Sequence, residues 1–131
     1  MKETRSASIE LHPAGCVVVR VRPGVSQTVD DAKENIAASV EVSGGRRLHP
    51  LLVNIVDSAP LDSDVRHYYV GGAMADNFTA LGLVVHGSPL GNMMGNVFFR
   101  MIDRKKSAEF PTRLFADEAS AIAWLTAVPR K

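Results

Sequence analysis

Residues 51–58 read LLVNIVDS, a nearly continuous apolar run that ends in an aspartate and a serine. Within that run, Asn54 interrupts an otherwise apolar stretch. A short run of this kind is typical of a β-strand that is covered on both faces of its sheet. Asp57 to Asp62 is predicted to be a loop. We therefore predict a strand from Leu51 to Val56 in the interior of a covered sheet.

Two strands are expected to precede this run and to form a hairpin. Residues 6–12 alternate polar and apolar side chains, which is the pattern of a half-buried strand. A second strand is predicted from Cys16 to Arg22, with alternate valines on one side. The turn Pro13-Ala14-Gly15 is too short for a crossover, so the two strands pair antiparallel.

The segment after the hairpin predicts a helix from about Ser26 to Val42. Thr28 and Asp31 have the spacing of a capping box, with Asp in place of the usual Glu. Apolar residues at helical spacing form one stripe along this helix. Gly44-Gly45 is a stop signal, so the helix ends there.

The remainder of the chain alternates helices and strands. A helix opens at Asp62 or Ser63, and Gly71-Gly72 breaks it. The elements beyond it are a strand over 81–85, a helix over 88–102, a strand over 111–115, and a last helix that Asp117 caps and Pro129 ends.

This order predicts an α/β fold in one domain that spans residues 1–131. The elements follow the sequence β-β-α-β-α-β-α-β-α, and repeated βα units imply parallel strands with right-handed crossovers. We expect a mostly parallel five-stranded sheet with an antiparallel first strand and helices mainly on one face. The partly protected opposite face would carry the polar strand residues Arg20, Arg22, Asn54 and His86.

Composition places the chain among ordinary globular domains. It has 131 residues, a formal net charge of +1 and 46% hydrophobic residues. The near-neutral charge argues against nucleic acid as a partner. No apolar run approaches the roughly 18 residues of a transmembrane segment, so we expect a cytoplasmic protein. The single cysteine, Cys16, lies in an apolar run and is expected to be a core residue.

The residues quoted above resemble those of one known family. The run LLVNIVDS, together with NFTALGLVVHGSPLGNMMGNVFF (77–99) and FPTRLFADEASAIAWL (110–125), is similar to the anti-sigma-factor antagonist (STAS) domain family. The resemblance is to its broad, SpoIIAA-like form, which includes lipid-carrier-like relatives. In that family an apolar strand runs into an Asp-Ser pair at the start of the next helix, and the serine is the phosphorylation switch.

The resemblance implies a non-enzymatic regulatory or protein-interaction module with a protein partner. It makes Ser58, beside Asp57, the candidate phosphorylation switch. The alternative function is the binding of a small apolar or lipid-like ligand, which needs a pocket of about 300 Å³ or more. A hydrolase is a third possibility, but no catalytic signature supports it. We expect no cofactor and no metal, because the four histidines lack ligand spacing.

Hydroxyl side chains gather where the predicted parallel strands end. Ser26, Thr28, Ser58 and Ser88 each lie near a predicted helix start, and open α/β sheets bind ligands at this edge. Helix N-termini favour anions, so a phosphate is a reasonable occupant. The alternative is that these residues serve only as helix caps.

The predicted helix over residues 88–102 is rich in methionine. Met93 and Met94 lie on its apolar stripe, whereas Phe99 falls outside it. Such a helix is a candidate surface for a partner or a ligand, since methionine adapts to varied surfaces. The alternative is a buried packing helix with one exposed aromatic residue. The partly covered sheet face also predicts a homodimer.

Overall fold

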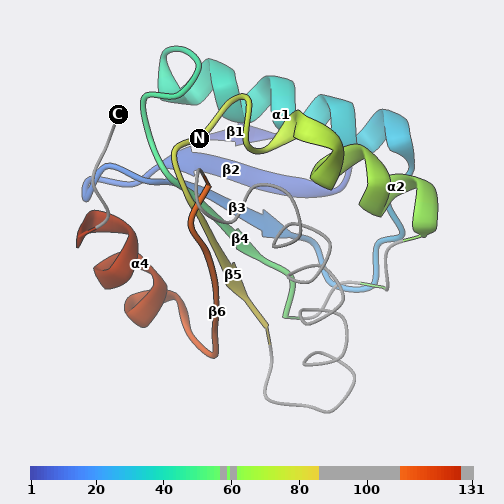
Figure 1. The fold of residues 1–131 in the computed structure, drawn as a ribbon. Coiled ribbons are helices and arrows are strands. Elements are labelled where there is room, and N and C mark those ends of the chain that lie inside the picture. Colours follow the sequence, from blue (N-terminus) through green and yellow to red (C-terminus); the bar gives the residue numbers. More distant parts are fainter. Residues whose placement is uncertain (57–58, 60–61, 86–109, 128–131) are drawn as a thin grey trace.

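The computed structural model describes residues 1–56, 59, 62–85 and 110–127, and its sheet contains six strands in sequential order (Figure 1). The strands are β1 (Lys2–Glu3), β2 (Ala7–Leu11), β3 (Val17–Val21), β4 (Leu51–Asn54), β5 (Leu81–Val84) and β6 (Thr112–Phe115). The helices are α1 (Val29–Ser43), α2 (Ser63–Tyr68), the π-helical turn η1 (Tyr69–Ala73) and α4 (Glu118–Ala127).

The predicted fold class is confirmed. Strands β1, β2 and β3 pair antiparallel, and β3 to β6 pair parallel. Strand β1 adds a sixth strand beyond the predicted five, because two residues are too short to produce a periodic pattern. The predicted helix over residues 88–102 lies outside the described residues.

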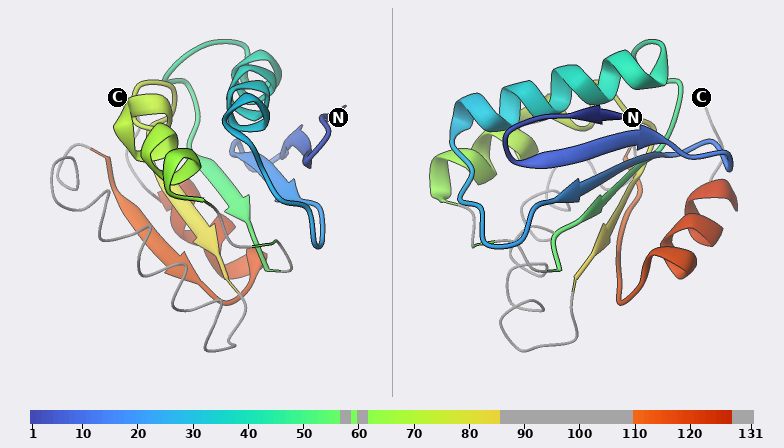
Figure 2. Two further views of the ribbon diagram at one scale, coloured as in Figure 1. Left: turned by 90° about the vertical axis from the view of Figure 1, so that its right-hand side faces the viewer. Right: turned by 180° about the vertical axis from the view of Figure 1, so that it is seen from behind.

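The helices divide between the two faces of the sheet. Helices α1 and α2 lie on one face, as the prediction placed them, whereas α4 folds back onto the other face (Figure 2). The crossovers through α1 and α2 step in one direction, which keeps both helices on the same side. Helix α4 follows the last strand and packs on β4, β5 and β6. It covers the part of the sheet that was expected to be only partly protected.

Side-chain alternation along the strands produces two cores. Val17, Val19 and Leu51 belong to the core beneath α1 and α2, whereas Val18 and Leu52 belong to the core beneath α4. Successive strand residues point to opposite faces, so both faces of β3 and β4 are apolar. Cys16 is fully buried in the α4 core, as expected from its apolar surroundings.

Glycines end one helix and bend another where they were predicted to do so. The cap of α1 is Gly44, with a left-handed φ of 84°. Gly72 has a φ of 125°, and a Cβ there would lie 2.8 Å from a carboxylate oxygen of Asp76. Positive φ values strain residues that carry a Cβ, so glycine is required at both turns. In the described part of the chain, no helix is both long and apolar enough to cross a bilayer.

Gly82 in β5 permits the close approach of α4. A Cβ at this position would lie 3.2 Å from Cδ1 of Leu125. We predict that Gly82→Val lowers the free energy of unfolding by about 1–3 kcal/mol, because the larger side chain overpacks this contact. Chemical denaturation measures the loss. In a Leu125→Ala background the same substitution should cost less, and an equal cost in both backgrounds would contradict the packing explanation.

Candidate functional site

The candidate site is the carboxyl edge, which we define as the edge where the parallel strands β3, β4 and β5 end. The loop of residues 22–28 leaves β3 at this edge and leads into α1. Residues 55–62 leave β4 and lead into α2. The N-terminal ends of α1 and α2 both lie on the side to which β3 and β4 point (Figure 1). The topology therefore places the starts of α1 and α2 at the same edge of the sheet.

The predicted site residues fall into two groups. Ser26 and Thr28 are described, and both lie in the loop between β3 and α1. The remaining candidates lie outside the described residues, and they are Asp57, Ser58, Ser88, Met93, Met94 and Phe99. The structure therefore places only Ser26 and Thr28 among the predicted site residues.

Thr28 is the N-cap of α1 and forms the predicted capping box. Its Oγ1 accepts the backbone N–H of Asp31 at 3.2 Å, and the Asp31 carboxylate accepts the N–H of Thr28 at 2.9 Å. Two backbone donors of the first turn are satisfied in this way. Ser26 is exposed, and its carbonyl oxygen accepts Nη2 of Arg5 at 2.8 Å. The hydroxyl of Thr28 thus serves the helix itself.

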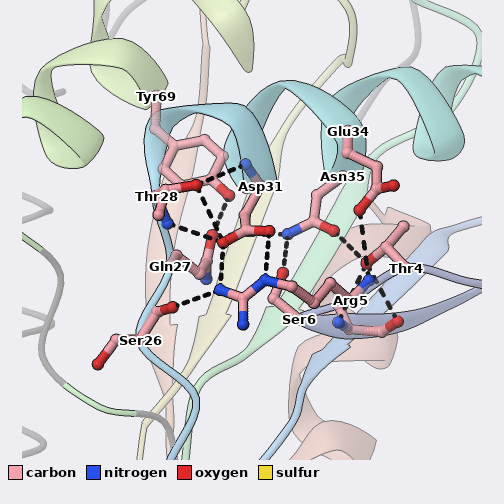
Figure 3. A network of polar contacts seen from close by, with 11 residues as sticks. Thr4, Arg5, Ser6, Ser26, Gln27, Thr28, Asp31, Glu34, Asn35 and Tyr69 are labelled. Atoms are coloured by element: carbon pink, nitrogen blue, oxygen red, sulfur yellow. Dashed lines mark hydrogen bonds and ion pairs between the residues drawn. The ribbon is translucent and has the colours of Figure 1, made fainter.

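Asp31 also binds Arg5, which comes from the turn between β1 and β2. Arg5 donates Nε to Oδ1 at 2.9 Å and Nη2 to Oδ2, so the pair is bidentate (Figure 3). The side chain of Asp31 is only 8% exposed, whereas that of Arg5 is 58% exposed. The hydrogen bonds from Arg5 hold the pKa of Asp31 well below its usual range, and those from Thr28 add to the effect.

A second set of buried contacts continues from Asp31 beneath α1. Asn35 donates Nδ2 to Oγ of Ser6 at 2.8 Å and accepts the hydroxyl of Thr4 (Figure 3). The hydroxyl of Tyr69 donates to Oε1 of Gln27 at 2.6 Å. Burial raises the pKa of Tyr69 to about 12, so this hydroxyl keeps its proton. The N-terminal segment, the loop after β3, α1 and η1 are thereby joined.

A small cavity lies between α1, η1 and the sheet. Its volume is about 30 Å³, and apolar side chains form most of its wall, among them those of Val19, Leu51 and Leu83 from β3, β4 and β5. Polar residues also line the cavity, among them Asn35, Ser39 and Tyr69. Their side chains form hydrogen bonds with other groups of the chain. A space of this size holds one or two waters, whereas small-molecule pockets measure about 300–1,000 Å³.

The other face of the sheet carries a cluster of charged residues at the same edge. Glu118, the first residue of α4, accepts Nε and Nη2 of Arg20 at 3.0 and 2.9 Å. It also accepts Nδ2 of Asn54 at 2.7 Å. Arg20 and Asn54 therefore face α4, and the hydrogen bond from Arg20 lowers the pKa of Glu118. Arg22 instead contacts Glu3, and His86 lies outside the described residues.

Helix α2 begins with an Asp-Ser pair that was not among the predicted site residues. Asp62 is the N-cap and Ser63 is the first helical residue, and both are exposed. Nδ1 of His67 lies 2.6 Å from the carbonyl oxygen of Ser63 and 3.2 Å from its Oγ. A carbonyl only accepts, so Nδ1 carries a proton and donates it there. That nitrogen cannot also take the proton of the serine hydroxyl, which argues against a serine nucleophile.

Asp62 and Ser63 could have been found from the sequence. The resemblance describes an Asp-Ser pair at the start of the helix after the apolar strand, and the helix was predicted to open at Asp62 or Ser63. Arg5, Asn35 and Gln27 were also missed. Polar residues every fourth position along α1, at Asp31, Asn35 and Ser39, were the available signal for a buried polar row.

Comparison with known sequences places the chain in a family. The sequence profile described as domain of unknown function DUF7793 matches residues 9–129. The chain belongs to this family. No curated protein matches it. Among the described residues, no group of three His, Cys, Asp or Glu side chains is arranged to hold a metal ion.

Two solved structures share the fold of this DUF7793 domain. One is the crystal structure of an anti-sigma factor antagonist from Mycobacterium paratuberculosis, with 18% identity, a TM-score of 0.61 and 92% of each chain covered. The other is an uncharacterized protein of the DUF3478 family with a SpoIIAA-like fold from Shewanella loihica PV-4. It is 15% identical, with a TM-score of 0.56 and coverage of 95% of this chain and 98% of that chain. The predicted resemblance is confirmed at the level of the fold.

We predict that Asp31→Asn lowers the free energy of unfolding by about 2 kcal/mol at pH 7, because buried charged hydrogen bonds are lost. The folded-state pKa of Asp31 is depressed, so its contribution is complete above about pH 5 and is lost as the pH falls toward that pKa. The difference between the two proteins should therefore shrink on acidification. Urea denaturation at several pH values measures it.

The matched control is Asp30→Asn, which alters the exposed neighbour in the same helical turn. This change should cost only a few tenths of a kcal/mol, as expected for an exposed charge near a helix N-terminus. Equal losses in the two variants would show that the Arg5 contact contributes nothing beyond the helix dipole.

Proposed function

We propose that this protein is a non-enzymatic interaction module of the anti-sigma-factor-antagonist type, with an anti-sigma factor as its partner. The main support is the exposed Asp62–Ser63 pair at the first residue of α2, on the carboxyl edge. The likeness of the fold to an anti-sigma factor antagonist, over 92% of both chains, adds to it. The geometry at His67 also supports a non-enzymatic role. Its Nδ1 donates to the carbonyl oxygen of Ser63 and so cannot act as a base for the hydroxyl of that serine.

Ser63 is our choice for the switch residue, and Ser58 is the alternative from the sequence. The family pattern requires the serine to stand at a helix start, and Ser63 occupies that position in α2. Phosphorylation would add about −1.5 to −2 charges beside the carboxylates of Asp62 and Asp64. The exposed surface at the start of α2 would become strongly acidic. A partner that fits the unmodified surface would then be repelled.

The alternative function is the binding of a small apolar ligand. The cavity beneath α1 is far smaller than the roughly 300 Å³ that such a ligand requires. A fluorescent fatty acid that binds the purified protein at micromolar concentration, with saturation at one molecule per chain, would favour this alternative. We expect no saturable binding.

We predict that Ser63→Asp abolishes binding to the anti-sigma factor, because the added charge imitates the phosphate. Ser63→Ala should bind as the unmodified protein does. Isothermal titration against purified anti-sigma factors encoded in the same genome measures both. The thermal melts of the two variants should stay close to that of the wild type, since Ser63 is exposed.

Ser58→Asp and Ser58→Ala form the matched control pair. If Ser63 is the switch, both Ser58 variants should retain binding. A loss of binding in Ser58→Asp alone would move the switch to Ser58 and overturn our choice of Ser63. If no anti-sigma factor from that genome binds the unmodified protein, the proposed function is wrong.

A further inference from the structure

Asn54, the last residue of β4, joins α4 to the chain beyond that strand. Its Nδ2 donates to Oε2 of Glu118 at 2.7 Å. Its Oδ1 accepts the backbone N–H of Val56 at 3.0 Å. One side chain therefore links the first residue of α4 to the backbone two positions after β4. We call this chain of contacts the Glu118–Asn54–Val56 relay.

The relay has a direction that follows from the chemistry of its groups. A carboxylate can only accept hydrogen bonds, so the NH₂ of Asn54 must face Glu118. The carbonyl oxygen of the amide then faces the N–H of Val56. If Glu118 is removed, only the N–H of Val56 still holds the amide in this orientation, so rotation of the amide by half a turn becomes easier. The NH₂ would then meet the N–H of Val56, and two donors cannot bond to each other.

Glu118 is well placed to hold this orientation. Arg20 of β3 donates Nε and Nη2 to the two carboxylate oxygens at 3.0 and 2.9 Å, which is the strong bidentate arrangement. Arg20 also donates Nη1 to Glu10 of β2 at 3.3 Å. The cluster is partly buried, so solvent screens it less than a surface pair. The position of the Glu118 carboxylate therefore depends on α4, which carries it, and on β3, which supplies Arg20.

We propose that α4 controls the exit of the chain from β4 through this relay. Movement of α4 away from the sheet would withdraw Glu118, free the amide of Asn54 and release the N–H of Val56. A protein that binds α4 could thus act on the segment after β4. The regulatory role of the relay rests on the proposed function, because both candidate serines, Ser58 and Ser63, follow Val56 in the chain. The linkage itself needs no partner.

Amide hydrogen exchange of the full chain, followed by NMR, tests the relay. In Glu118→Ala the exchange of the Val56 amide should accelerate roughly tenfold relative to that of Ile55, as expected for the loss of one hydrogen bond. The N–H of Ile55 donates to the carbonyl of Val84 at 3.0 Å and belongs to the sheet. A merely structural effect of the variant would accelerate both amides in parallel, and that result would overturn the proposal.

Two further variants separate the relay from general loss of charge. Glu10→Gln removes an ion pair from Arg20 but leaves the relay intact, so the ratio of Val56 to Ile55 exchange should not change. Asn54→Ala removes the side-chain oxygen that accepts the N–H of Val56. In that background, Glu118→Ala should no longer alter the ratio, and a persistent effect would contradict the relay. These outcomes are independent of whether an anti-sigma factor binds.

Discussion

The bidentate contact between Asp31 and Arg5 is the interaction on which the arrangement of the carboxyl edge depends. The carboxylate is buried, and an unpaired buried charge would be costly. Its acceptors are shared between the guanidinium of Arg5 and the capping groups of Thr28. The first turn of α1 is therefore held to the turn between β1 and β2. The loop after β3 joins them, because Arg5 also binds the carbonyl of Ser26.

A comparable cluster holds the opposite side of the same edge. Glu118 fixes the start of α4 against Arg20 of β3 and Asn54 of β4. The loop after β3 is thus anchored on the face of α1, and the end of β4 is anchored on the face of α4 through Asn54. The start of α2 lies at this edge, with Ser63 exposed. Such a scaffold suits an exposed residue whose modification is read by a partner.

Local patterns in the sequence predicted most of the fold. The apolar run from Leu51, the capping box of Thr28 and the stop at Gly44 each depend on residues a few positions apart, and the structure confirms all three. Strand β4 ends at Asn54, earlier than predicted. The N–H of Val56 bonds to the side chain of Asn54 instead of a neighbouring strand. The predicted place of this strand in the interior of the sheet is confirmed, because β4 lies between β3 and β5.

Contacts between distant segments account for what could not be predicted. Arg5 and Asp31 are 26 residues apart, and Asn54 and Glu118 are 64 residues apart. Periodicity carries no information on such pairs. The choice between the two candidate serines is a separate matter, since two Asp-Ser pairs lie five positions apart in the sequence. Our proposal of Ser63 rests on the start of α2 at that residue, and Ser58 stays a prediction from the sequence.

The most direct test of this account is the mass of the protein isolated from its own cells, followed by fragmentation to locate any modification. We expect a fraction that carries one phosphate on Ser63, and an unmodified fraction that co-purifies with an anti-sigma factor. A phosphate on Ser58 alone would contradict the assignment of the switch. A single unmodified species that co-purifies with a small apolar molecule would contradict the account as a whole.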